Sequence, residues 1–238
     1  MPPPPPLPPA GQPHRYRPLR GPAHATVALL VVAIMGEVLS LGSSVAALSE
    51  LADYSDTTAW DDPALDSLNA REAIIALVEF ASFLAAGTAF IVWFHRAYHN
   101  VRALWPRHSA FLGTGWAIGG WIVPIVAFWF PYMMMREVWR AGDRDAPPDS
   151  ADPNQRPLHP VLITWWLLWI FALVTGNAVG RITRDADDVA GRRDGSVVNI
   201  VSLSASIPAA LLAIWIVRTA TRRMNDRATQ LWGVPPPG

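Results

Sequence analysis

The chain contains no cysteine, which excludes disulfide bonds, thiolate metal sites, thiol catalysis and covalent attachment of c-type haem. It also contains no lysine, so all nineteen basic residues are arginine. Charge is scarce overall: 16% of the residues are charged, against about 25% in soluble proteins. The formal net charge of zero argues against a nucleic-acid partner. With 51% hydrophobic residues, this shortage of charge predicts that the chain lies in a lipid bilayer.

Standard catalytic motifs are missing as well. There is no P-loop, nucleophile elbow, H-E-x-x-H motif or dinucleotide-binding fingerprint, so neither an enzymatic activity nor a cofactor is predicted. His95 and His99 are spaced to share one helix face, and His108 and His159 could join them, but interfacial histidines usually contact only water and headgroups. The acidic stretch 49–71 has no EF-hand spacing, so no metal site is predicted.

Long apolar runs are abundant. Four of them, 26–48, 73–94, 161–179 and 197–217, are long enough to cross a hydrocarbon core of about 30 Å. A fifth run, 111–135, has no charge but contains Pro124, Pro131 and the Gly119-Gly120 pair, where the backbone can turn. We therefore predict an all-α polytopic membrane protein with four full transmembrane spans plus a proline-broken hydrophobic segment. Five spans is the alternative.

The two ends differ from this core in composition. Residues 1–24 are rich in proline and poor in side chains that could be buried, so we predict a disordered cytoplasmic tail. Residues 219–238 are basic and then proline-rich, which predicts a second tail. The helical membrane domain is expected to cover 25–218.

One region has a recognisable pattern of residues. Its members are Trp93, Arg96 and Asn100, followed by Gly115-Trp116, Gly119-Gly120-Trp121, Pro124, Pro131-Tyr132, Arg136-Glu137 and Trp139. In this pattern the chain resembles an actinobacterial family of uncharacterised membrane proteins, catalogued as domain of unknown function 4328. The resemblance implies a multi-span membrane protein with proline-rich tails and brings no activity with it. Ala127 departs from the family, which often has asparagine there.

Two carboxylates interrupt the first two spans. Glu37 and Glu79 are costly in lipid, and an ionisable residue within a span indicates a functional site or a protonated carboxyl held between helices. By helical rise, the two carboxylates lie about 4 Å apart in depth if the spans are antiparallel, so we expect them to meet. Asn177 and Asn199, near the ends of later spans, are expected to complete a buried polar cluster.

A basic and aromatic band flanks the broken segment. It predicts an interfacial anchor with contacts to anionic lipid headgroups, and comprises Trp93, Arg96, Asn100, Arg102, Arg107, Arg136, Trp139 and Arg140.

Arginine counting predicts the topology. If 111–135 enters the membrane and returns to the same side, fourteen of the nineteen arginines lie on the side of the N-terminus, whereas with five spans only ten do. The re-entrant arrangement therefore predicts a multi-pass protein of the cytoplasmic membrane with its N-terminus in the cytoplasm.

The function expected first is a non-enzymatic envelope assembly or regulatory component with lipid and membrane-protein partners. A small transporter or channel using Glu37 and Glu79 is the alternative.

Overall fold

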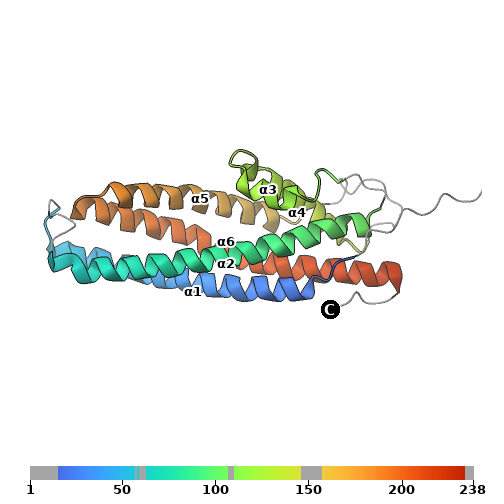
Figure 1. The fold of residues 1–238 in the computed structure, drawn as a ribbon, viewed down its shortest axis with the longest axis horizontal. Helices are drawn as coiled ribbons and strands as arrows, with labels where there is room; N and C mark the ends of the chain where they lie inside the picture. The colour runs from blue at the N-terminus through green and yellow to red at the C-terminus, as the bar shows by residue number, and fades with distance from the viewer. Residues whose placement is uncertain (1–15, 57, 59–62, 107–109, 146–156, 234–238) are drawn as a thin grey trace, which may run out of the picture. The chain divides into compact units, whose positions relative to one another are not determined.

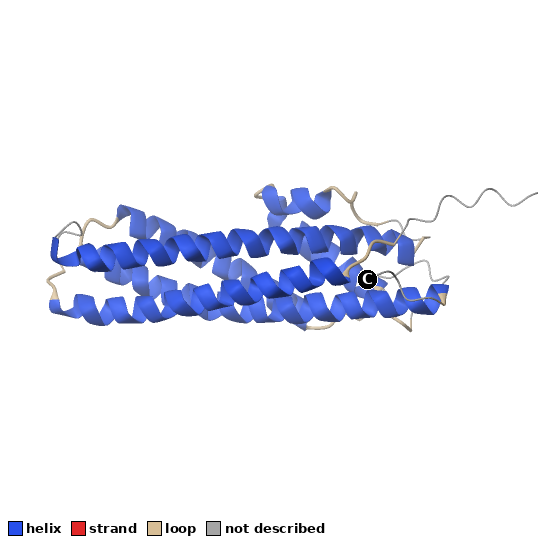
Figure 2. Ribbon diagram, turned by 60° about the horizontal axis from the view of Figure 1, so that its bottom comes forward, coloured by secondary structure: helices blue, strands red, loops and turns tan. Residues whose placement is uncertain are grey.

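The computed structural model describes residues 16–56, 58, 63–106, 110–145 and 157–233. The chain folds into two compact units. We call Gly21–Trp93 with His159–Thr219 the four-helix unit, and Met1–Arg20, Phe94–Leu158 and Ala220–Gly238 the three-segment unit. The described residues of both units form helices and loops without a β-strand (Figure 2).

Four long helices supply the spans. They are α1 (Arg20–Glu50), α2 (Asp66–Leu104), α5 (Val161–Asp185) and α6 (Val189–Trp232), and each is long and apolar enough to cross a membrane. Short 3-10 turns, η1 (Leu51–Asp53) and η2 (Pro63–Leu65), flank the connection between α1 and α2. We call this end of the four-helix unit the loop end. The predicted all-α, polytopic fold is confirmed.

Helices α1 and α2 are antiparallel neighbours. The Thr26 hydroxyl donates to the Ala89 carbonyl at 2.9 Å near the start of α1. Further along, a Cβ on Gly36 would lie 3.3 Å from Ser82 Oγ, which marks a close approach of the two backbones. Near the loop end, Ser43 donates to the carboxylate of Glu72.

The other neighbours are antiparallel too, and α1, α2, α5 and α6 run alongside one another (Figure 1). The Phe83 and Trp169 rings stack at 6.0 Å between α2 and α5. Asn199 of α6 bonds to α1, and the Ser202 hydroxyl of α6 donates to the carbonyl of Ala172 on α5 at 3.4 Å. Within this unit, α2 therefore finishes and α5 starts at the same end. The chain between them makes no net crossing, as a re-entrant segment requires.

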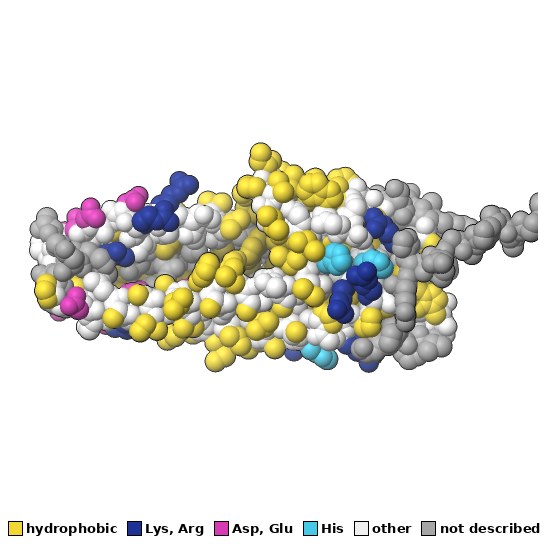
Figure 3. Space-filling model, viewed as in Figure 1, with side chains coloured by type: hydrophobic (Ala, Val, Ile, Leu, Met, Phe, Trp, Pro, Cys, Tyr) yellow, Lys and Arg dark blue, Asp and Glu magenta, His cyan; other side chains and the backbone are white. Residues whose placement is uncertain are grey.

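The four-helix unit is apolar outside and small or polar inside. Met35, Leu77 and Phe80 are more than 60% exposed, and hydrophobic side chains line the visible faces of these helices in Figure 3. The inward positions of α1 are small instead: Ala33, Ser40, Ser44 and Ala47 are buried. This distribution suits a unit whose outer solvent is lipid, and we treat the chain as a multi-pass membrane protein.

The proline-broken segment lies in the three-segment unit. Helix α3 (Trp116–Ile122) ends where Val123, which precedes Pro124, takes an extended conformation, as residues before proline favour. The turn η3 (Val126–Phe128) leads to α4 (Phe130–Ala141), which has a proline in its first turn. From α3 to the segment Val126–Ala141 the helix axis changes direction by 109°. The chain bends at Pro124, whereas Gly119 and Gly120, where a turn was also expected, lie inside α3.

Both tails are shorter than predicted. Residues 1–15 and 234–238, where disorder was expected, lie outside the described residues. Tyr16 and Leu19 are buried, and α1 begins at Arg20 rather than after residue 24. At the other end, α6 continues to Trp232, so most of the expected tail 219–238 is helix.

Specific contacts explain why the residues just before α1 have a defined position. The Tyr16 hydroxyl donates to Asn225 Oδ1 at 2.8 Å, and its ring packs edge-on against Trp232. Burial raises the pKa of this hydroxyl, which keeps its proton on the oxygen. The side chain of Asn100 accepts from the Arg17 N–H and donates to the Arg17 carbonyl, both at 2.8 Å.

Candidate functional site: a polar cavity in the four-helix unit

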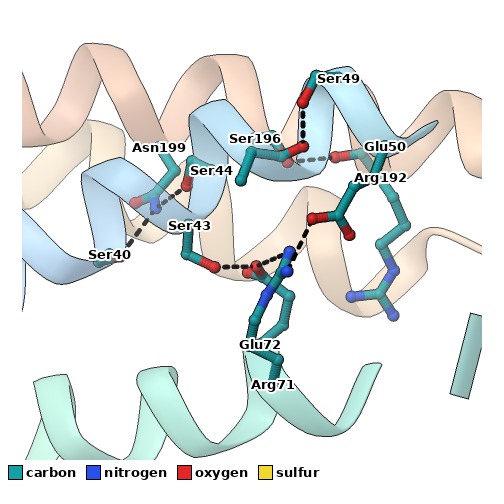
Figure 4. A network of polar contacts seen from close by, with 11 residues as sticks. Ser40, Ser43, Ser44, Ser49, Glu50, Arg71, Glu72, Arg192, Ser196 and Asn199 are labelled. Atoms are coloured by element: carbon teal, nitrogen blue, oxygen red, sulfur yellow. Dashed lines mark hydrogen bonds and ion pairs between the residues drawn. The ribbon is translucent and has the colours of Figure 1, made fainter. Parts of the chain in front are cut away.

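The four-helix unit has a partly open cavity of about 470 Å³, to which all four long helices contribute. Its apolar wall consists of short aliphatic side chains and leucines. Its polar wall is formed by Ser40 and Ser44 of α1, Asn69, Glu72 and Glu79 of α2, Thr183 of α5, and Arg192, Ser196 and Asn199 of α6. Figure 4 shows the polar contacts around it. A polar cavity of this size among otherwise apolar spans is the strongest candidate for a functional site.

The deep level of the cavity lies away from the loop end and centres on Asn199. Its amide nitrogen donates to Ser40 Oγ at 3.2 Å and to Ser44 Oγ at 3.0 Å (Figure 4). The Ser40 side chain lies near the carboxylate of Glu79, which lines the same level. One amide and two hydroxyls from two helices are thereby joined, with a carboxylate from a third helix beside them.

The outer level lies nearer the loop end and is more strongly charged. The carboxylate of Glu72 accepts a hydrogen bond from the Ser43 hydroxyl and lies 3.9 Å from the guanidinium of Arg71. Arg71 also forms an ion pair with Glu50 at 2.8 Å. Arg192 interacts electrostatically with Glu72 from the opposite wall. At this level each acidic side chain therefore has a basic one nearby.

The loop after α1 is fastened to α6 at this end. Arg193 pairs with Asp56 and donates to the carbonyl oxygens of Leu51 and Tyr54. The N–H of Val189 donates to the Thr58 carbonyl at 3.0 Å. Below these bonds lies a small apolar cluster of Leu51, Leu65, Leu68 and Val189. Because Leu51 and Leu68 also line the cavity, the cluster forms its wall at the loop end.

Glu37 lies beside the cavity without lining it. Its carboxylate lies near the side chains of Ser206 and Glu79. Its Oε2 atom is buried and has no hydrogen-bond partner among the described residues. The two carboxylates expected to meet are therefore close enough to interact, across the narrow α1–α2 contact at Gly36.

Asn177 differs from the expectation that placed it in the same cluster. It is exposed, and its amide donates to the Leu173 carbonyl of its own helix at 2.7 Å. The helix phase explains this, since α5 faces the unit with Trp165, Trp166 and Ala172 instead.

Sequence reasoning missed Glu72 and Arg192. Both lie near span ends, where charges are ordinarily assigned to the interface. The signal that could have found them is spacing: Glu72 precedes Glu79 by seven residues and Arg192 precedes Asn199 by seven. Two helical turns put each pair on one face.

The basic and aromatic band is largely internal. Trp93 is fully buried in the four-helix unit. In the three-segment unit, Asn100, Trp139 and Arg140 are at most 5% exposed, which does not suit the expected contacts with lipid headgroups. Trp139 packs under the guanidinium of Arg223 at 4.7 Å.

The remaining band residues are partly buried. Arg96 reaches the Pro18 carbonyl at 3.5 Å, Arg102 donates to the Leu112 carbonyl at 3.1 Å, and Arg136 lies 5.8 Å from the Tyr132 ring centre. Arg107 lies outside the described residues. The band residues of the three-segment unit therefore contact loops and helices of that unit.

Metal binding was also considered. Across the described ranges, no three His, Cys, Asp or Glu side chains come together in a group that could hold a metal ion. The ring of His159 packs against that of Trp215 at 5.2 Å.

Comparison with known proteins gives one match. A family model described as "Domain of unknown function (DUF4328)" matches residues 56–222, which include α2, the broken segment, α5 and most of α6. No curated protein and no solved structure matches the chain.

Proposed function

We propose that this chain, which belongs to the family described as domain of unknown function 4328, moves protons or small polar solutes across its membrane through the cavity of the four-helix unit. The single observation that supports this function is the cavity itself, about 470 Å³ in volume, with Glu79 in its wall and Glu37 beside it. Carboxylates are expensive at these positions, and such groups in membrane proteins mark pathways for ions and protons.

The pair of carboxylates suits proton exchange. Two carboxyl groups close together in an apolar medium cannot both ionise cheaply, so such a pair is suited to taking up and releasing a proton. Ser40 lies near Glu79 and Ser206 lies near Glu37, and Glu72 and Arg192 are charged groups that line the cavity on its loop side. A proton leaving Glu79 can therefore enter the cavity without crossing the apolar wall.

Vesicles containing the purified chain provide the test. We expect a pH gradient to dissipate faster in these vesicles than in empty ones. Glu79→Gln and Glu37→Gln should each abolish the difference while keeping the helical content and gel-filtration profile of the wild type. Asp185→Asn changes an exposed carboxylate at the end of α5 and should leave the rate unchanged. Equal rates for Glu79→Gln and the wild type would reject proton movement through this pair.

A role in envelope assembly or regulation is the second candidate. An apolar groove runs along the outer side of α1 and α2, with Gly42 and Ala46 in its floor. A Cβ on Gly42 would meet nothing within 4 Å, so the groove is open there. Small residues four apart are a docking motif for membrane helices, so the proposed occupant is the single transmembrane helix of a partner protein.

This role has its own test. A cysteine in place of Met35, which also lines the groove, should crosslink to one identified membrane protein in native membranes, and Gly42→Leu should prevent the crosslink. Crosslinks to many proteins, or one that survives Gly42→Leu, would count against it.

The membrane in which the protein lies, and its orientation there, are also part of the proposal. We propose the cytoplasmic membrane, with both termini and α4 on the cytoplasmic side and the loop end outside. The arginine distribution supports this orientation, since only Arg71, Arg181, Arg184, Arg192 and Arg193 then lie on the outer side.

A further inference from the structure

The hydrogen-bonding capacity of the deep level is unevenly used. An asparagine amide has two N–H donors, and those of Asn199 are directed at Ser40 and Ser44. Ser40 accepts one of these bonds and lies near Glu79. The donors of the deep level are thus mostly engaged within the protein.

Acceptors remain in surplus at the same place. The carboxylate of Glu79 offers about four lone-pair sites, and the single hydroxyl of the neighbouring Ser40 can fill only one of them. The carbonyl oxygen of Asn199 takes no part in the two amide bonds. An anion would need donors that are already engaged, whereas an ammonium group has three donors and no acceptor.

The cavity has room for more than an ion. A water molecule occupies about 30 Å³ in the liquid, so a volume of about 470 Å³ exceeds what a bare cation would fill. Ala73, Ile75, Ala76 and Val179 provide an aliphatic wall along which an alkyl chain can lie. The space therefore matches a cationic head with a short apolar body.

Arg192 restricts the other end of the ligand. It lines the outer level seven residues before Asn199, about 10.5 Å along the helix axis. Its guanidinium offsets the charge of Glu72, so the outer level offers a second ammonium group no net negative charge. A monoamine is therefore preferred over a diamine.

We infer that the cavity binds a small primary monoamine as its ammonium ion, with the nitrogen at the carboxylate of Glu79, the hydroxyl of Ser44 and the carbonyl oxygen of Asn199. This inference rests on the proposed function, whose solute it names by chemical class. Binding to a protonated Glu79 exchanges one positive charge for another: the carboxyl proton leaves to water as the ammonium ion enters.

The test measures binding to the full chain in detergent micelles by titration calorimetry. The probe is n-butylammonium chloride, with n-butanol, sodium butyrate and 1,4-diaminobutane dihydrochloride as matched probes at equal ionic strength. We expect saturable binding of butylammonium, binding of the diamine at least several-fold weaker, and no saturable binding of butanol or butyrate. Butanol or butyrate binding as tightly as butylammonium would overturn the inference.

Variants locate the binding site. Glu79→Gln should weaken butylammonium binding at least tenfold, and Asp185→Asn should not change it. Wild-type affinity in Glu79→Gln would overturn the assignment. If Glu79→Gln fails to fold, Ser44→Ala replaces it, with a several-fold loss expected and wild-type affinity again contradicting the site.

The inference and the proposed function can fail separately. Saturable binding without any proton movement in vesicles would leave an amine-binding protein and reject transport. Proton movement without butylammonium binding would reject the amine and keep the proton pathway.

Discussion

Asn199 is the residue that ties α6 to α1. Its two hydrogen bonds reach serines one helical turn apart, so one side chain fixes both the distance and the register of the two helices. In a membrane, hydrogen bonds between helices contribute about 0.6 kcal/mol each on average and up to about 1.7 kcal/mol. Asn177 has no such role, because its amide bonds only within its own helix.

These two asparagines form a matched pair for mutation. Asn199→Ala should lower the free energy of unfolding in detergent by about 1–2 kcal/mol, the sum of two bonds between helices. Asn177→Ala should change it by less than about 0.5 kcal/mol, as for other exposed positions. Unfolding monitored by circular dichroism during titration with sodium dodecyl sulfate measures both. An equal loss in the two variants would show that Asn199 does not link the helices.

At single positions the sequence showed which polar residues are unusual. It did not show as well whether their side chains face the inside or the outside of the four-helix unit. The spans are apolar on every side, so no polar stripe defines which face of a helix turns inward. Glu79 and Asn199 were recognised because polar residues in lipid are conspicuous. Asn177 was assigned inward by the same argument and lies outward, since a single asparagine can bond to its own helix without facing another.

At the scale of elements, Gly36 sets how closely α1 and α2 approach. A Cβ at this position would lie 3.3 Å from Ser82 Oγ and 3.8 Å from the Glu79 Cα atom. The close approach brings Glu79 within reach of both Glu37 and Ser40. The separation of these two helices therefore controls the deep level of the cavity.

Gly36→Leu should force α1 and α2 apart and destabilise the protein by about 1–3 kcal/mol, as expected for overpacking. Gly42→Leu is the control, because the space beside Gly42 is open. Midpoints of thermal unfolding in one detergent provide the comparison. We expect a lower midpoint for the Gly36 variant alone, and a similar fall in both would show that the effect is not specific to the α1–α2 contact.

Helix number could be predicted from the sequence, whereas helix ends could not. The length of an apolar run reflects the thickness of the hydrocarbon core of the membrane. The limits 73–94 predicted for the second span follow from such a run. Helix α2 nevertheless extends from Asp66 to Leu104, because a helix continues past the lipid wherever its backbone bonds and side-chain packing allow. The break at Pro124 was predictable, since proline restricts the residue before it.

At the scale of the whole molecule, the helix directions determine the topology. The antiparallel contacts of α2 with α5 place the start and the finish of the intervening chain at one end of the four-helix unit. A fifth full span would reverse α5 and α6. The arginine count favours the same arrangement, so two independent arguments support the prediction of four spans and a re-entrant segment over the alternative of five spans.

Cysteines at Asp149 and Thr229 test this arrangement in a chain that has none of its own. Both should resist an impermeant thiol reagent added to intact cells, and a cysteine at Asp53 should react. Membrane disruption should expose all three and serves as the control for reactivity. Reaction of only one of the first two in intact cells would contradict the re-entrant topology.

The three-segment unit has a consequence for biosynthesis. Tyr16 is bonded to Asn225, 209 residues later, so this contact of the unit cannot form until residue 225 has been synthesised. The ribosome releases the residues of the four-helix unit earlier, up to Thr219. Contacts between such distant parts of a chain form slowly, and a nascent chain meets them last. A ribosome stalled before residue 220 would therefore have synthesised both parts of the four-helix unit, 21–93 and 159–219. The side chain of Asn100 would still lack the residues of its own unit that follow position 219.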